Sequence, residues 1–154
     1  YAAVGMLFAA QDLTNGFPAL LKLLKLAAPL TALLLAVTGI RMWKGKSPVP
    51  GTWAVVCCVL VLRLVAAYQT WSREPQMMDY LFSLLGSLCL TGYAYHRAAK
   101  EAGAAKKSCW LFRLGLLAGF FCLTAGTGRV PLPFYTVMAC GVMLDVLSGE
   151  EAPC

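Results

Sequence analysis

Arg63 is the residue of this sequence whose type and position point most directly to chemistry. It lies in the apolar run VCCVLVLRLVAAY, residues 56–68, near the middle of a longer apolar segment. If this segment crosses a bilayer, an arginine at its centre costs about 2.5–3.5 kcal/mol on insertion scales, and charges at that depth usually face other helices or a water-filled cavity. The small residues Ala66, Ala67 and Thr70 share its helical face, and small residues allow a neighbouring helix to approach closely.

A polar stripe along residues 77–95 offers a partner for this arginine. Its members recur every four residues, so on a helix they follow one slowly drifting face: Asp79, Ser83, Ser87, Thr91 and Tyr95. Segments joined by a short loop usually pack side by side, so we expect Arg63 to face the bundle interior and to hydrogen-bond to the stripe. Two interpretations stay open. Arg63, Ser83, Ser87 and Thr91 form either a polar pocket for an anionic or hydrogen-bonding solute, or a structural contact between two helices.

Two further charged residues lie inside apolar segments. Arg113 and Asp145 fall near the same end of consecutive antiparallel segments, which would allow them to form an ion pair. The alternative is that each side chain extends separately to the membrane surface, because long side chains keep their charged end in water. A proton relay through Asp145 is disfavoured, since no second acidic residue lies at mid-depth.

A run of small residues predicts close helix packing. The segment GLLAG places glycines at 115 and 119, and Cys122 and Gly126 follow at similar spacing. Small residues at this spacing let two helices approach to backbone contact. We therefore expect Gly115, Gly119, Cys122 and Gly126 to form a helix-packing face. Its neighbour is another helix of the bundle or a second copy of the chain, and a backbone-lined solute path is the third alternative.

Signatures of enzymatic and metal chemistry are missing from the sequence. It contains no HExxH, GxSxG or P-loop motif and no pair of carboxylates within an apolar segment. The seven cysteines include no CxxC pair, and His96 is the one histidine. Cysteines in apolar runs behave as small hydrophobic residues. We expect no metal site, no cofactor and no catalytic residue.

The elements that must position these residues are apolar helices. The 154-residue chain is 60% hydrophobic and 13% charged, against about 45–50% and about 25% in soluble domains. Its apolar runs have about the 20 residues that a spanning helix requires. We therefore predict an all-α, polytopic transmembrane bundle that forms a single domain over residues 1–154. Residues 1–10 would be the end of a further, truncated span, and five full spans would follow at 18–40, 52–71, 77–95, 109–127 and 132–147.

The distribution of basic residues predicts an orientation. Loops 41–51 and 96–108 carry three and four lysines and arginines, whereas the opposite loops carry two, Arg73 and Arg129. Since basic loops tend to stay in the cytoplasm, both basic loops should be cytoplasmic. The net charge of +6 does not indicate nucleic acid binding, because no basic face interleaved with aromatic residues is present. The expected partners are the lipid bilayer and either a second copy of the chain or another subunit of a membrane complex.

The layout of the chain also resembles that of known proteins. The short basic loop RMWKGKSP and the passage LLGSLCLTGYAYHRAAK, which leads into the second basic loop, carry this resemblance. In layout the chain resembles small multi-span inner-membrane proteins of unassigned function from anaerobic Gram-positive bacteria, which implies a bacterial cytoplasmic membrane and no particular activity. We expect a non-enzymatic membrane component or complex subunit. The alternative is a small-solute transporter, or its membrane subunit, with a polar midplane site around Arg63.

Overall fold

The computed structural model of the chain is helical. It describes residues 1–8, 18–45, 49, 51–71, 77–104, 109–126 and 133–147; Arg73 and Arg129 and the side chains of Thr70 and Asp79 lie outside the described part. Within these residues there are six helices and no strand: α1 (Ala2–Phe8), α2 (Pro18–Trp43), α3 (Thr52–Trp71), α4 (Met77–Glu101), α5 (Cys109–Gly126) and α6 (Pro133–Leu147). The all-α class predicted from the sequence is confirmed.

Local sequence signals explain where several helices begin and end. Proline suits the first helical position, where its missing N–H would have no partner in any case, and it begins both α2 at Pro18 and α6 at Pro133. Glycine adopts the left-handed conformation that commonly ends a helix. Gly45 (φ +69°) follows α2, and Gly103 (φ +72°) follows α4. These boundaries depend on neighbouring residues, so they can be found in the sequence.

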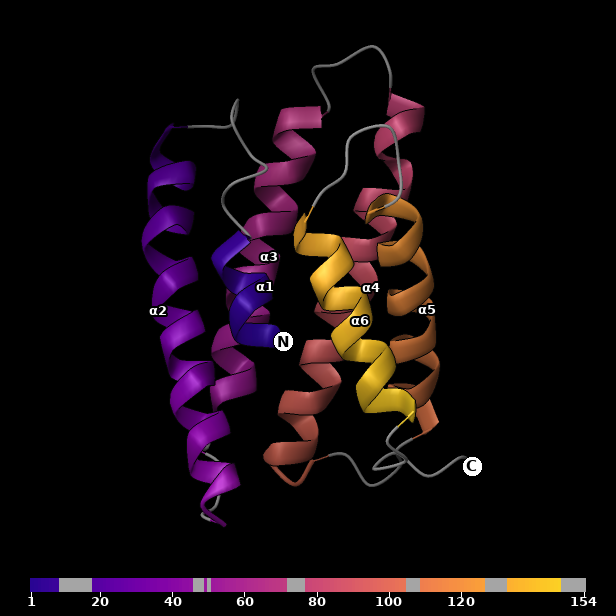
Figure 1. Ribbon diagram of the computed structural model, residues 1–154. Coiled ribbons are helices and arrows are strands. Elements are labelled where there is room, and N and C mark those ends of the chain that lie inside the picture. The colour runs from indigo at the N-terminus through magenta and orange to yellow at the C-terminus, as the bar shows by residue number, and fades with distance from the viewer. Residues whose placement is uncertain are drawn as a thin grey trace.

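The helices run alternately up and down and form a closed ring (Figure 1). Each helix packs against the next one along the chain, and α1 also packs against α6. The interior receives side chains from all six helices, including Met6, Leu24, Val56, Leu90, Cys122 and Phe134. The ring therefore gives α3 and α6, which are far apart in the sequence, a shared interior.

The sequence predicts five full spans, but fewer of the described helices meet the length and hydropathy of a membrane span. Two of them, α2 over Ala19–Trp43 and α3 over Thr52–Gln69, are long and apolar enough to cross a membrane. Helices α5 and α6 are apolar but have 18 and 15 residues. At about 1.5 Å per residue, α6 is about 22 Å long, less than the roughly 30 Å of a hydrocarbon core. Helix α4 has 25 residues, but its polar stripe lowers its hydropathy.

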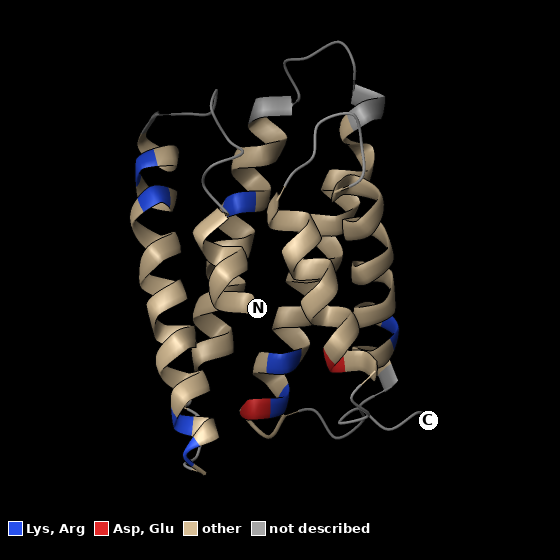
Figure 2. Ribbon diagram, viewed as in Figure 1, with Lys and Arg blue, Asp and Glu red and all other residues tan. Residues whose placement is uncertain are grey.

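Charge is unevenly distributed along the bundle. Figure 2 shows basic residues towards both ends of the bundle and acidic residues towards one end. Lys22 and Lys25 lie near the beginning of α2, and Arg41 lies in its last turn. Arg63 falls between the ends and is buried, with 1% of its surface exposed. Apolar side chains are exposed along the same helices, among them Leu26, Leu30 and Leu33 on α2, Val61 and Val65 on α3, and Leu116, Leu117 and Phe120 on α5.

Candidate functional site

Arg63 belongs to the first of two polar clusters, the central cluster, which consists of Arg63, Ser87, Phe134 and Tyr135. Its Nη1 donates a hydrogen bond to the Tyr135 hydroxyl on α6, 3.0 Å away. That hydroxyl also shares a hydrogen bond of 2.7 Å with Ser87 Oγ on α4. Arg63, Ser87 and Tyr135 are 1%, 3% and 0% exposed. One tyrosine hydroxyl therefore connects α3, α4 and α6 within the interior.

Two aromatic rings of α6 hold the arginine as well. Cζ of Arg63 lies 3.8 Å from the ring centroid of Phe134 and 4.9 Å from that of Tyr135. A cation near a ring face is attracted by the negative charge of the π system, most strongly where water is excluded. Because both rings belong to the first turn of α6, the guanidinium is level with the beginning of that helix. The buried charge is thus stabilised by groups of the protein itself.

The four residues predicted to form a midplane pocket have different surroundings. Ser87 reaches Arg63 through Tyr135, and Ser83, one turn earlier on α4, is 4% exposed. The Thr91 hydroxyl donates to the Ser87 carbonyl of its own helix, 2.7 Å away. Among the described side chains, Arg63 reaches the polar stripe through Tyr135 of α6, which lies between Arg63 and Ser87. The ring arrangement of the helices brings α6 into this position. A direct bond of Arg63 to the stripe stays a prediction, because the side chain of its member Asp79 lies outside the described part.

Phe134 and Tyr135 are absent from the residues that the sequence analysis singles out. The available signal is the aromatic pair in LPFYTVM at the beginning of an apolar segment, because aromatic faces suit a buried cation. The aromatic pair does not show which helix carries the cation, because Arg63 and Tyr135 are 72 residues apart in the sequence. The partner is decided by tertiary packing.

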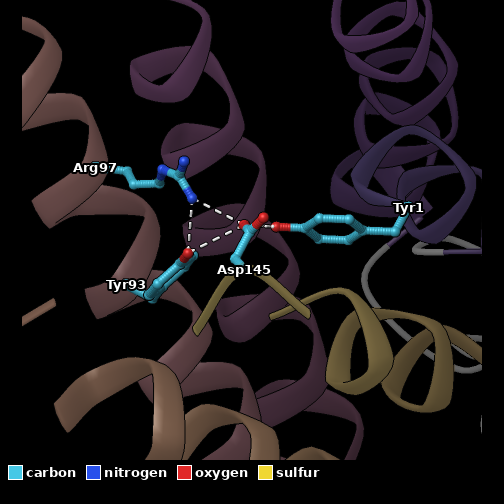
Figure 3. Close-up of polar contacts among 4 residues, drawn as sticks. All are labelled: Tyr1, Tyr93, Arg97 and Asp145. Carbon is cyan, nitrogen blue, oxygen red and sulfur yellow. Dashed lines mark hydrogen bonds and ion pairs between the residues drawn. The ribbon is translucent and has the colours of Figure 1, made fainter. Parts of the chain in front are cut away.

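The second group, the end cluster, consists of Tyr1, Tyr93, Arg97 and Asp145 (Figure 3). Arg97 Nη1 donates to Asp145 Oδ2 over 2.8 Å and to the Tyr93 hydroxyl over 2.8 Å. The Tyr93 hydroxyl in turn donates to Asp145 Oδ2 over 3.2 Å. The Tyr1 hydroxyl donates to the same oxygen from the other side. A single carboxylate oxygen therefore joins α4, α6 and the residue before α1.

The guanidinium of Arg97 is fixed in orientation and stays charged. Its Cζ lies 5.1 Å from the ring of Trp53 at the beginning of α3, and the Arg97 and Asp145 side chains are 20% and 25% exposed. Burial alone would lower the pKa of Arg97, but the neighbouring Tyr93 and Asp145 outweigh it and raise that pKa above its ordinary value. Partial exclusion of water strengthens the Coulomb attraction between Arg97 and Asp145, while desolvation of the two charges opposes it.

The predicted ion pair between Arg113 and Asp145 is not the one that forms. Asp145 pairs with Arg97 of α4, while Arg113 is exposed on α5. The reason is the length of α4, which continues to Glu101 beyond the predicted end of its span at residue 95. This additional helix carries Arg97 to the end of α6. The other alternative, in which both side chains extend separately to the membrane surface, does not hold for the paired Asp145, and for the exposed Arg113 it stays a prediction.

The small-residue face of α5 packs inside the bundle. A Cβ atom on Gly115 would lie 2.7 Å from Val146 Cγ2, and one on Gly126 would lie 2.5 Å from Thr136 Oγ1. A Cβ on Gly119 would overlap the side chain of Met143. These three neighbours belong to α6, while Cys122 is buried and its Sγ would lie 3.2 Å from a Cβ at Gly86 of α4. A second copy of the chain has no room on this face while α6 occupies it.

Two cavities lie away from the central cluster. The larger, about 560 Å³, lies beside the end cluster and is lined by residues of α1, α2, α3, α4 and α6. The other, about 460 Å³, is an apolar groove between α3 and α4. Arg63, Ser83, Ser87 and Thr91 line neither of them. Within the part of the chain that the structure describes, no three His, Cys, Asp or Glu residues are grouped as metal ligands.

Together these features define an all-helical ring with one arginine held in its interior and another at one end. Comparisons with known protein families, with curated proteins and with solved structures find no match.

Proposed function

We propose that the chain is an integral membrane protein with α2 to α6 in the bilayer, and that it acts as a non-enzymatic membrane component or complex subunit. The observation that carries this proposal is the distribution of charge and exposure. Apart from the buried Arg63, the charged residues of the described part lie towards the two ends of the bundle, and leucine, valine and phenylalanine are exposed between them. A water-soluble bundle turns polar residues outward, and extensive exposed apolar surface marks contact with a membrane or a partner. A bilayer covers such a surface on every side.

The helix lengths are compatible with this arrangement. Helices α2 and α3 are long enough for a hydrocarbon core and expose many of their apolar residues. For the shorter α5 and α6, local thinning of the bilayer costs only fractions of a kcal/mol per Å of mismatch. The exposed Arg113 lies near the beginning of α5, where a long side chain can extend its charge to the interface.

The proposed orientation places the basic loops 41–51 and 96–108 in the cytoplasm of a bacterial cell. It is supported by the number of lysines and arginines in these loops. The end cluster then lies near the cytoplasmic surface, because Arg97 belongs to the last turns of α4. The first turn of α6, which holds Arg63, lies towards the outer surface. A charge displaced from the midplane costs less than one at the centre.

Membrane fractionation tests the proposal. The protein should sediment with membranes, resist washing with alkaline carbonate and urea, and be released by detergent. Reporter fusions after Gly45 and Ala104 should report the cytoplasm, and a fusion after Trp71 should report the outside. Release of the protein by carbonate without detergent would refute the proposal. If the fusions after Gly45 and Ala104 report the outside and the fusion after Trp71 reports the cytoplasm, the orientation alone is refuted.

The alternative function, a small-solute transporter with a site around Arg63, has one supporting observation, a charge in the interior. The contacts of that charge favour a structural role, because the guanidinium already donates to Tyr135 and stacks on two rings. Single cysteines at Ala66, Ala67, Ser83 and Ser87, in a background without native cysteines, separate the two functions. We expect none to react with a membrane-impermeant thiol reagent. Labelling at these positions would favour the transporter.

A further inference from the structure

The cavity beside the end cluster has the size and lining of a ligand site. Its volume of about 560 Å³ falls within the range of about 300–1,000 Å³ typical of small-molecule pockets. One wall, from α1 and α2, is mainly apolar: Ala2, Ala3, Leu35, Ala36, Gly39 and Met42. The charged lining comes from α4 and α6. The cavity is therefore amphipathic, as a site for an amphipathic ligand must be.

The charged part of the lining contains both signs in equal number. Arg97 and Lys100 supply two positive charges, and Glu101 and Asp145 supply two negative ones. Arg97 and Asp145 hold each other in place, whereas Lys100 and Glu101 are exposed. The lining has no net charge but contains separate positive and negative groups. It therefore complements a ligand that carries one charge of each sign better than it complements a simple anion or cation.

We infer that this cavity binds the headgroup of a zwitterionic phospholipid that carries a primary ammonium, drawn from the cytoplasmic leaflet. The inference rests on the proposed membrane location, which puts the cavity at headgroup depth. The phosphate lies against Arg97 and Lys100, and the ammonium lies against Glu101 and Asp145. The glycerol and the first methylenes of the acyl chains lie along the apolar wall of α2.

A primary ammonium fits this lining better than a quaternary one. An ammonium donates hydrogen bonds, and carboxylates accept them. A quaternary ammonium cannot donate and is usually bound by aromatic faces. The rings at the charged lining are already engaged: the Arg97 guanidinium lies over Trp53, 5.1 Å from its centroid, and the Tyr1 hydroxyl donates to Asp145. Phosphatidylethanolamine is thus expected to bind better than phosphatidylcholine.

Native mass spectrometry of the delipidated protein in detergent tests the inference. The intact protein is incubated separately with phosphatidylethanolamine, phosphatidylcholine and phosphatidylglycerol, and the retained lipid is counted. We expect phosphatidylethanolamine to be retained about threefold to fivefold more than either of the others, the size of effect that one or two partly exposed ion pairs produce. Equal retention of the three lipids would overturn the inference.

Variants of the exposed lining residues supply the second readout. Glu101→Gln removes the charge that faces the ammonium. The ratio of retained phosphatidylethanolamine to retained phosphatidylglycerol should therefore fall towards one. Lys100→Gln should lower retention of all three lipids by a similar factor. Lys44→Gln is the matched control, because Lys44 is an exposed basic residue at the same end of the bundle and does not line the cavity. Lipid selectivity that is the same in Glu101→Gln and Lys44→Gln would overturn the inference.

Competition with a soluble compound distinguishes a site for a lipid from a site for a free phosphate compound. Glycerophosphoethanolamine carries the same headgroup without acyl chains, and we expect it to displace the bound lipid poorly. Displacement by this compound as effectively as by the lipid itself would mean that the site takes a soluble zwitterion. The membrane location is judged separately. Release of the protein by carbonate refutes the proposed function, whereas a detergent-dependent protein without lipid selectivity refutes only the headgroup site.

Discussion

Removing one hydroxyl group, in Tyr135→Phe, should measure how much the central cluster stabilises the bundle. The substitution leaves both rings near Arg63 but deletes the acceptor 3.0 Å from its Nη1 and the partner of Ser87 Oγ. A hydrogen bond to a charged group contributes about 1.5–3 kcal/mol to stability, although polar contacts between membrane helices average only about 0.6 kcal/mol. Because Arg63 is charged and 1% exposed, we expect the larger range, a loss of about 1.5–3 kcal/mol in the free energy of unfolding.

The assay is unfolding of the purified protein in mixed micelles, followed by circular dichroism as the denaturing detergent is increased. Tyr68→Phe is the matched control: Tyr68 is 59% exposed, and its change should stay within about 0.5 kcal/mol. Ser87→Ala, alone and combined with Tyr135→Phe, completes a double-mutant cycle, and the two effects should be less than additive because both remove the same hydrogen bond. A loss below about 0.5 kcal/mol for Tyr135→Phe would refute the reasoning and mean that Arg63 is satisfied without the tyrosine.

Three further predictions concern other parts of the bundle. Gly119→Leu should destabilise the protein by more than about 2 kcal/mol in the same assay, because the leucine side chain would overlap α6. The control Gly39→Ala should be neutral or slightly stabilising, because a Cβ there meets nothing within 4 Å. Equal effects of the two substitutions would contradict the packing of α5 on α6. Asp145→Asn should cost about 1–3 kcal/mol because it removes the charged acceptor of the end cluster, and a neutral result would show that the cluster adds no stability. Cys58 is exposed and should react with a lipid-soluble maleimide but not with a membrane-impermeant one. Cys122 is buried and should react with neither reagent before the protein unfolds. Labelling of Cys58 by the impermeant reagent would place that face of α3 in water.

Much of the helical layout is readable from the sequence. The predicted segments 52–71 and 132–147 lie within one residue of α3 and α6, and both α2 and α6 begin at a proline. Such boundaries are local, because they depend on the length of an apolar run and on residues that favour a helix end. The end of α4 departs furthest from the prediction. It continues to Glu101 through residues that read as a loop, and the contacts of Arg97 with Asp145 and Tyr93 explain why the helix persists there.

Contacts between helices show what a linear pattern leaves open. Helical periodicity assigns Arg63, Ser83 and Ser87 to faces of their own helices, but it does not state which third helix meets them. Among the described contacts, Arg63 donates to Tyr135, and Asp145 forms its ion pair with Arg97 and not with Arg113. Each of these pairs joins helices that are not consecutive along the chain, so the depth and order of the segments could not reveal them.

By itself, the sequence determined that the chain is all-helical, where most of its helices lie, and that its charges gather near their ends. These properties follow from composition and from interactions within a few residues. Only the tertiary structure decided that the helices close into a ring with α1 against α6, that α5 turns its glycines to α6, and that Arg63 meets Tyr135 and Arg97 meets Asp145. The physical reason is that packing fixes the rotation and neighbours of every helix, and a contact between distant segments depends on those two quantities together.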